Sequence, residues 1–179
     1  QSLGAKSGPN GINAITGTNK VYVPDVDDVK VIDTSTLTVT KTIKLLNLSA
    51  TRADEGCFDP DHKIYMISSN NSPVKYATFI NTETDTAFLT VLSQGGAFDK
   101  SEGNEQCQYD PITKSFLAAN GGTTANHRGE IDVIPVSSLL ALAPGSSVNI
   151  GDLPGLQRWP LPACDPSGMD LGPRTDMIV

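Results

Sequence analysis

Carboxylate and amide side chains recur at matching places in two segments of the chain. Ala53-Asp54-Glu55 and Asn104-Glu105-Gln106 align with one another, and each stands just before a stretch rich in β-forming residues. If these stretches are the inner strands of a ring, the side-chain oxygens converge on its central channel, and a hard cation such as calcium prefers oxygen ligands of this kind. The sequence therefore raises the hypothesis of a bound divalent cation. The alternative is that the same side chains cap strand ends and face solvent.

A second polar group lies at the tip of the longest insert. His127-Arg128-Gly129-Glu130 offers a histidine that could act as a general base and an arginine that could hold an anion, although most loop histidines are only solvated. No residue is assigned a catalytic role. The predicted ligand-binding set comprises Asp54, Glu55, Asn104, Glu105, His127, Arg128 and Asp165.

Composition and missing motifs exclude several function classes. With 2 histidines and no Gly-x-Ser-x-Gly, His-Glu-x-x-His or phosphate-binding loop, the sequence does not support a hydrolytic triad, a zinc peptidase or a nucleotide enzyme. The 13 Lys and Arg against 20 Asp and Glu give a net charge of −7, which disfavours nucleic acid as a partner and favours cationic ligands. No apolar stretch approaches the ~20 residues that span a bilayer.

The three cysteines, Cys57, Cys107 and Cys164, lack the Cys-x-x-Cys spacing of thiolate metal sites. One disulfide among them would fit an oxidising compartment, with the pairing left open. The charged fraction of 18% and the many Thr, Ser, Asn and Gly residues resemble exported β-proteins. We therefore predict a secreted or periplasmic location.

A strand, turn and strand pattern is repeated along the chain. It is clearest at 56–66, returns at 107–117 and 14–23, and begins again at 170–179. A period of about 40 to 60 residues made of short strands is typical of a β-propeller, a ring of four-stranded antiparallel blades. The predicted blades are 10–50, 51–100, 101–163 and an incomplete one at 164–179, and the side chains expected between them are Phe58, Tyr65, Ile80, Tyr109, Phe116 and Ile134.

Most strands follow from alternating apolar residues. They are expected at 11–15, 20–24, 29–33, 38–43, 54–58, 63–68, 76–80, 86–92, 105–109, 114–119, 130–135 and 148–151, the last as the fourth strand of the third blade. The segment 137–143 is also a candidate helical turn, because its leucines do not alternate. Trp159 is expected to cover the core at a blade junction.

The spacing of these strands separates constant turns from variable connections. The turns between first and second strands and between third and fourth strands keep their length, whereas the connections from second to third strand and from one blade to the next do not. In an antiparallel blade the two variable connections open on one side of the ring, here named the variable-loop face. Variable loops on a rigid scaffold usually carry the binding site, so we predict the site on this face.

Tyr22-Val23-Pro24-Asp25 followed by Val29-Lys30-Val31-Ile32-Asp33-Thr34 resembles the YVTN-repeat family of seven-bladed propellers. The match weakens in the second repeat, at Tyr65-Met66 and Phe79-Ile80-Asn81-Thr82, and is poor in the third. The family is similar to lactonase-like propellers and to quinone- or haem-linked propeller subunits. This resemblance implies an all-β propeller and transfers no catalytic motif to any residue of the chain.

These observations favour an exported β-propeller that binds a partner or small ligand on the variable-loop face. The alternative is a lactonase-like hydrolase, in which a cation at the channel mouth polarises a carbonyl while Glu55, Glu105 or His127 moves protons. An electron-transfer subunit is a third possibility. Bound calcium or zinc would favour the hydrolase, and an absorbing cofactor would favour the third.

Three blades and part of a fourth leave two blade faces without a neighbour. The sequence is therefore predicted to be a fragment of a seven-bladed ring, or a half-ring that a second chain completes. The fragment is the favoured prediction, because the sequence stops at Met177-Ile178-Val179, in the middle of an expected strand.

Overall fold

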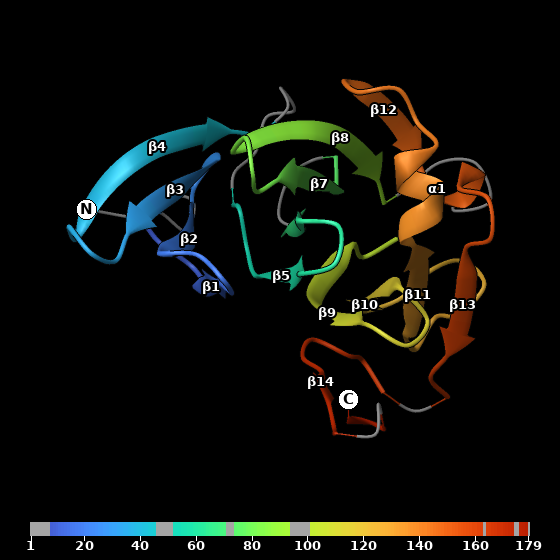
Figure 1. The fold of residues 1–179 in the computed structure, drawn as a ribbon. Helices are drawn as coiled ribbons and strands as arrows, with labels where there is room; N and C mark the ends of the chain where they lie inside the picture. Colours follow the sequence, from blue (N-terminus) through green and yellow to red (C-terminus); the bar gives the residue numbers. More distant parts are fainter. Residues whose placement is uncertain are drawn as a thin grey trace, which may run out of the picture.

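The computed structural model describes residues 8–45, 52–70, 74–93, 101–162, 164–173 and 176–178. Its secondary structure is nearly all β-strand, in sheets arranged side by side around a common centre (Figure 1). No helix among these residues is long and apolar enough to span a membrane. The prediction of an all-β chain built from four-stranded antiparallel sheets is confirmed.

Each of the first two sheets has four consecutive strands in chain order, each antiparallel to the next. The first contains β1 (Asn13–Ile15), β2 (Lys20–Asp25), β3 (Asp28–Asp33) and β4 (Thr38–Lys44). The second contains β5 (Gly56–Asp59), β6 (Ile64–Ser69), β7 (Tyr76–Asn81) and β8 (Thr86–Leu92). These eight strands lie where the alternation of apolar residues predicts them.

The third sheet departs from the predicted order at its outer edge. It contains β9 (Asn104–Asp110), β10 (Ser115–Asn120), β11 (Glu130–Pro135) and β13 (Gln157–Pro160), and a short pair, β14 (Asp170–Leu171) with β15 (Met177–Ile178), follows. The prediction that 148–151 forms the fourth strand was wrong. The strand there, β12 (Ser146–Asn149), instead pairs in parallel with β8 as a fifth strand of the second sheet.

The departure has a local cause. The candidate helical turn is present as α1 (Val136–Leu140), which begins directly after β11 and buries Val136 and Leu139 in the core shared by the second and third sheets. The helix carries the chain away from the third sheet to the edge of the second, and a 3-10 helix at Ile150–Asp152 turns it back. Trp159 lies in β13 with 36% of its surface exposed, so it does not cover the core as predicted.

The sheets pack face to face through their apolar side chains. The ring of Tyr22 in the first sheet contacts that of Tyr65 in the second edge-on, with 5.1 Å between the ring centroids. The rings of Phe79 in the second sheet and Phe116 in the third are also edge-on, with 5.5 Å between their centroids. Because side chains alternate between the two sides of a strand, the second sheet is covered on both faces and β6 is buried throughout. Of the six side chains predicted between blades, Tyr65, Ile80, Tyr109, Phe116 and Ile134 are buried, and Phe58 is partly buried.

A disulfide joins two neighbouring inner strands. Cys57 of β5 and Cys107 of β9 are bonded, whereas Cys164 is free. Both half-cystines are buried within the core shared by the second and third sheets. The bond therefore fixes adjacent blades to one another at their inner edge.

Four of the constant turns share one conformation. Each opens with an Asp or Asn whose side-chain oxygens accept hydrogen bonds from backbone N–H groups two and three residues further on, and each closes with a residue at positive φ. The opening and closing residues are Asp33 with Leu37, Asp59 with Lys63, Asn81 with Asp85, and Asp110 with Lys114.

Removing the disulfide should strongly destabilise the fold. Replacing Cys57 and Cys107 together by alanine frees a loop of 50 residues in the unfolded chain, for which loop-closure entropy gives a loss of about 4 kcal/mol in the free energy of unfolding. Urea unfolding followed by circular dichroism measures this change, and Cys164→Ser serves as the control. A loss as small as that of the control would contradict the structural role of the bond.

Leu37→Gly should stabilise the protein. Leu37 has φ of 55° and an 81% exposed side chain, so a glycine relieves backbone strain there without removing a core contact. We expect the free energy of unfolding to rise by about 0.5 to 1 kcal/mol. Thr42→Gly, in the exposed strand β4, should lower the free energy of unfolding instead, because the backbone there is extended. If both variants changed the free energy of unfolding in the same direction, relief of backbone strain at Leu37 would be refuted.

Candidate functional site

Several variable connections meet around a cavity of about 580 Å³ on the variable-loop face. They are the β6–β7 connection, the segment that enters β9, the β10–β11 connection and the segment after β13. The lining residues are Asn70, Lys75, Glu102, Glu105, Gly121, His127, Asp165, Pro166 and Ser167. Among the described residues, no constant turn contributes to the lining, so the cavity lies on the face that the spacing predicts for a site.

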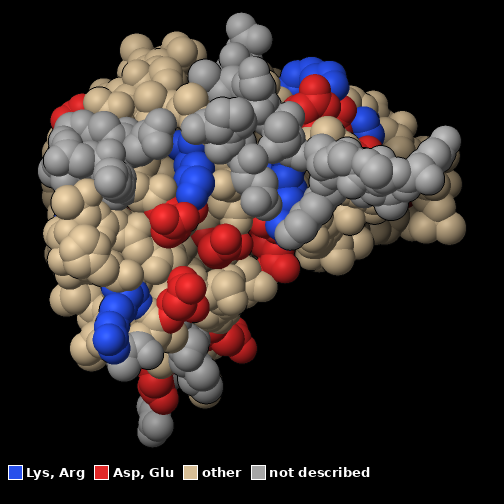
Figure 2. Space-filling view, turned by 180° about the vertical axis from the view of Figure 1, so that it is seen from behind, with Lys and Arg blue, Asp and Glu red and all other residues tan. Residues whose placement is uncertain are grey.

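Acidic side chains gather on one face of the molecule. Viewed from the side opposite to Figure 1, Asp and Glu side chains lie in the middle of the face and near its concave edge, with Lys and Arg side chains beside them (Figure 2). This distribution agrees with the excess of carboxylates in the sequence. A concave acidic surface concentrates cations from solution.

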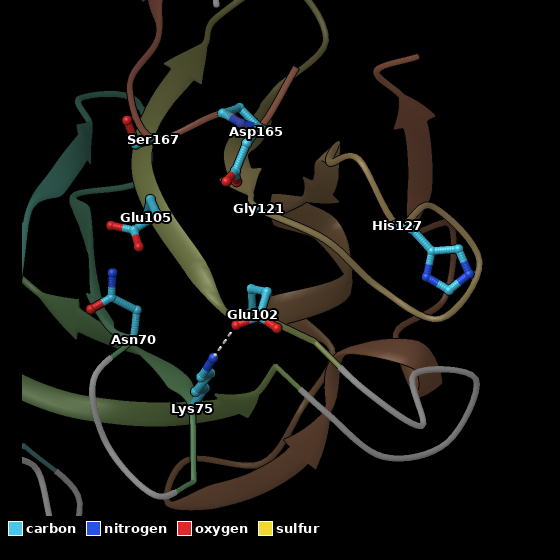
Figure 3. A pocket seen from close by; sticks show the side chains of 9 residues that line it. Asn70, Lys75, Glu102, Glu105, Gly121, His127, Asp165 and Ser167 are labelled. Carbon is cyan, nitrogen blue, oxygen red and sulfur yellow. Dashed lines mark hydrogen bonds and ion pairs between the residues drawn. The ribbon is translucent and has the colours of Figure 1, made fainter. Parts of the chain in front are cut away.

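Acidic side chains from different elements surround the cavity (Figure 3). Glu105 comes from β9, Glu102 from the segment before it, and Asp165 from the connection that follows β13. The ammonium group of Lys75 lies 3.1 Å from a carboxylate oxygen of Glu102. The lining is thus almost entirely polar, with carboxylates in excess.

Two glycines allow these side chains to come close. A Cβ at Gly121 would lie 2.8 Å from an oxygen of Asp165, and a Cβ at Gly103 would lie 2.9 Å from Cδ of Lys75. Gly103 also has φ of 86°, a conformation that favours glycine. The close approach of the polar side chains therefore requires glycine at both positions.

The structure brings together only part of the predicted ligand-binding set. Glu105, His127 and Asp165 line the cavity. Arg128 lines a smaller adjoining hollow of about 230 Å³, which it shares with His127 and Asp165. Asp54, Glu55 and Asn104 do not line either space.

The expected convergence of the two aligned carboxylate and amide segments is not seen. Asp54 is buried, and its carboxylate oxygen Oδ1 lies 3.1 Å from a guanidinium nitrogen of Arg52. The same oxygen accepts a hydrogen bond from the side-chain amide of Asn10. Glu55 packs against Gly11, and Asn104 belongs to a separate buried network. The described residues contain no group of three or more His, Cys, Asp or Glu side chains that could hold a metal ion.

The buried network lies next to the cavity and centres on Asp132 of β11. One carboxylate oxygen, Oδ2, accepts hydrogen bonds of 2.9 Å from the amides of Asn104 and Asn120, and within the described residues no donor reaches the buried Oδ1. Asn104 lies between Glu102 and Glu105 in sequence, and Asn120 precedes Gly121. The network therefore anchors two segments that line the cavity.

Asp132 has a second carboxylate beside it. Glu130, on the same side of β11, is fully buried and is held by Arg158, whose guanidinium nitrogens lie 2.7 and 2.8 Å from it. Burial raises the pKa of Asp132 to about 7, the hydrogen bonds from Asn120 and Asn104 oppose this rise, and the charge of Glu130 adds to it. Burial beside Glu130 therefore favours the protonated, neutral form of Asp132.

Sequence reasoning missed several of these residues, although signals for them were present. Asn70 and Lys75 are the first and last residues of an insert that the spacing marks as variable. Asp132 alternates with the apolar Ile131 and Val133 in a strand expected to be covered on both sides. A carboxylate at such a position must be buried, which is the signal that would have found it.

The fold and the cavity define an all-β protein of the β-propeller type. Neither a family model nor a curated protein matches the sequence. Among solved structures, the fold is similar to hydrazine synthase of Kuenenia stuttgartiensis, with a TM-score of 0.65 and 15% identity over 98% of this chain. It is also similar to dihydro-heme d1 dehydrogenase NirN in complex with DHE, with a TM-score of 0.59 and 13% identity over 98% of this chain.

At these identities the likeness shows the fold alone. The chain spans 42% of the length of the hydrazine synthase chain and 32% of the NirN chain. Both are larger than the part matched, which is consistent with an incomplete propeller.

Asp132→Asn should remove a pH dependence of stability. Asp132 binds its proton more tightly in the folded chain, with a pKa of about 7, than in the unfolded chain, where it is near 3.8. Its contribution to the free energy of unfolding is therefore complete below about pH 4 and is lost as the pH rises to about 7. Within this range the free energy of unfolding falls by up to about 1.4 kcal/mol for each pH unit. Asparagine has nearly the same shape, keeps an oxygen acceptor for both amides and has no titrating proton.

Thermal unfolding at a series of pH values tests this expectation. We expect Asp132→Asn to be more stable than the parent chain at pH 8 and to show a flatter profile between pH 4 and 7. Glu83→Gln, an exposed change in a constant turn, should keep the parent profile. An Asp132→Asn profile parallel to that of the parent would show that Asp132 does not titrate in this range.

Proposed function

We propose that this chain is part of an exported β-propeller that binds a small polar ligand, or a partner that reaches into the same cavity, on the variable-loop face. The observation that carries the proposal is the polar cavity of about 580 Å³. This volume lies in the range of ~300–1,000 Å³ that is typical of small-molecule sites.

The origin of the lining residues supports a binding role. They come from connections whose lengths vary between repeats, while the paired strands below keep their geometry. Such loops can change their side chains without disturbing the packing of the sheets, which is how a rigid scaffold acquires a specific site.

The disulfide supports export. Cys57 and Cys107 are placed in adjacent inner strands and are joined within a buried core. Disulfides of this structural kind persist in oxidising compartments and are rare in the reducing cytosol. A secreted or periplasmic location is therefore part of the proposal.

The partner in this proposal includes whatever completes the ring. The first sheet packs one face against the second sheet, and on its other face Val21, Val23 and Ile32 are partly exposed. We propose that further blades, in the same chain or in a second one, cover this face. A seven-bladed ring of the YVTN or lactonase-like kind is the form that the sequence resemblance supports.

The hydrolase with a cation at the channel mouth stays an alternative. It requires a stoichiometric metal ion, which elemental analysis of the purified protein would reveal. Calcium or zinc bound one to one would favour it over a purely binding propeller.

A ligand screen with a blocked cavity tests the binding proposal. Gly121→Leu should fill the cavity, because even a Cβ at this position comes within 2.8 Å of Asp165 and 3.5 Å of Glu102. Ser137→Leu, an exposed change in α1, adds the same side chain away from the cavity. Cationic, anionic and neutral small molecules are then compared by the melting temperatures of the three proteins.

A true cavity ligand stabilises the parent chain and Ser137→Leu but not Gly121→Leu. At a concentration a hundredfold above its Kd, the stabilisation is about 2.7 kcal/mol, or roughly 5–10 °C in Tm for a chain of this size. Ligands that stabilise all three proteins equally, or a library in which none acts, would count against a cavity site.

A further inference from the structure

We propose that proton loss from Asp132 loosens two connections that line the cavity, the segments 101–103 and 121–127, while the sheets stay folded. Both connections are anchored on a buried polar network that includes the Asp132 carboxyl group. The inference rests on the proposed function in taking these connections as the lining of a binding site, and it adds the regulation of that site by pH.

Asp132 differs in its partners from the other buried carboxyl groups of the described residues. Each of the others is held by a cationic side chain or by backbone N–H groups: Asp28 by Lys30 and Lys44, Asp54 by Arg52, Glu130 by Arg158, and Asp59 and Asp110 by N–H groups of their turns. Asp132 accepts hydrogen bonds from two neutral amides, and no donor among the described residues reaches its second oxygen. A negative charge on Asp132 is therefore poorly compensated.

The cation that faces Asp132 across the sheet binds Glu130 instead. Arg158 of β13 is the cross-strand partner of Asp132, but its guanidinium nitrogens lie 2.7 and 2.8 Å from a carboxylate oxygen of Glu130. The other oxygen of Glu130 accepts hydrogen bonds from the side chains of Thr123 and Asn126. Glu130 is thus well placed to carry the negative charge of the pair, and a second charge beside it would be repelled.

The groups around Asp132 favour its neutral form. Its own strand presents the negative Glu130, β9 and β10 present the neutral Asn104 and Asn120, and β13 presents Arg158, which is bound to Glu130. Burial raises the pKa of Asp132 to about 7, the two amides oppose this rise, and the charge of Glu130 adds to it. The carboxyl group therefore changes its charge close to neutral pH.

Asn120 links Asp132 to both connections. Its side-chain nitrogen donates to Asp132 and lies 3.0 Å from the hydroxyl of Ser101, and its side-chain oxygen accepts a hydrogen bond of 3.2 Å from the backbone N–H of Gly122. The two connections are also joined to one another, because the N–H of Glu102 donates to the carbonyl of Gly122 at 2.8 Å. A change in the position of Asn120 therefore acts on both connections together.

The network lies at the ends of strands, so it can open while the sheets stay paired. Asn120 is the last residue of β10, and its partners Glu130 and Asn104 are the first residues of β11 and β9. The pairing of β9 with β10 is already irregular there, with a register shift between Ala118 and Asn120. Strand ends open at a lower free energy than the core strands to which they belong. Local opening therefore gives an ionised Asp132 access to water.

The direction of the pH dependence follows from the two states. Asp132 has a pKa of about 7 when the connections are closed and a pKa near 3.8 when opening exposes it to water. The equilibrium constant for opening should therefore rise between about pH 4 and pH 7, by up to about tenfold for each pH unit, and level off above this range. The cavity lining is fixed in mildly acidic surroundings and loosened at neutral pH.

Amide hydrogen exchange of the purified chain, resolved by residue with NMR, tests the inference without a ligand. Exchange rates at each pH are divided by the intrinsic rates of an unstructured peptide, which removes the chemical pH dependence of exchange. The amides of Glu102, Gly122 and Thr123 should lose protection by up to about fiftyfold between pH 5 and pH 7. Low concentrations of urea should leave their exchange unchanged, because local opening exposes little surface.

Two variants and one further signal control the measurement. Asp132→Asn should remove the pH dependence at the three amides, whereas Glu83→Gln, an exposed change in a constant turn, should keep that of the parent chain. The carboxyl carbon signal of Asp132 in the parent chain should titrate with a midpoint of about pH 7. This signal tests the inference even if Asp132→Asn does not fold.

Three results separate the inference from its alternatives. Protection that does not change with pH, or a carboxyl signal that titrates near pH 4, would overturn the inference and leave the proposed cavity function standing. Protection that falls only together with that of amides in the middle of β10 and β11, with the same dependence on urea, would overturn it in favour of global unfolding. Local pH-dependent opening in a chain for which the ligand screen fails would support the inference for the connections and count against the proposed function.

Discussion

Burial of the second sheet on both faces is the constraint on which the rest of this structure depends. Apolar side chains of β6 pack against the first sheet on one face and against the third sheet on the other. Neither face therefore has room for solvated polar groups. Polar chemistry is consequently confined to the ends of strands and to the connections between them. The cavity occupies one such set of ends, and the constant turns occupy the opposite set.

The same constraint explains why the polar groups that do enter the interior form a connected network. Asp132 and Glu130 lie on a strand covered on both sides, and an isolated buried carboxylate would be strongly destabilising. Two amides and one guanidinium donate hydrogen bonds to these carboxylates and so compensate part of this cost. Burial also raises the pKa of Asp132, which favours its neutral form. Because Asn104 and Asn120 also belong to the segments that line the cavity, the buried network holds the cavity lining in place.

Most of the fold could be predicted because its signals are local. Alternating apolar residues mark the strands, and an Asp or Asn at the start of four of the constant turns marks where strands reverse. The position of β12 could not be predicted, since no local pattern reveals a parallel pairing between Ser146 and Leu89 of β8, 57 residues earlier in the chain. In the site, the spacing of loops led to Glu105, His127 and Asp165. Lys75 and Glu102 were missed, because only the packing of adjacent blades shows that they meet.

The bond between Cys57 and Cys107 also has a mechanical consequence. A force that pulls on the two ends of the chain passes directly from Cys57 of β5 to Cys107 of β9 through the disulfide, so the strands β6, β7 and β8 lie outside the covalent path of the force. The loop between the half-cystines, a sequence separation of 50 residues or about 170 Å of extended chain, stays out of the stretched path until the bond is reduced. A propeller fixed in this way would lengthen fully only where the disulfide is reduced.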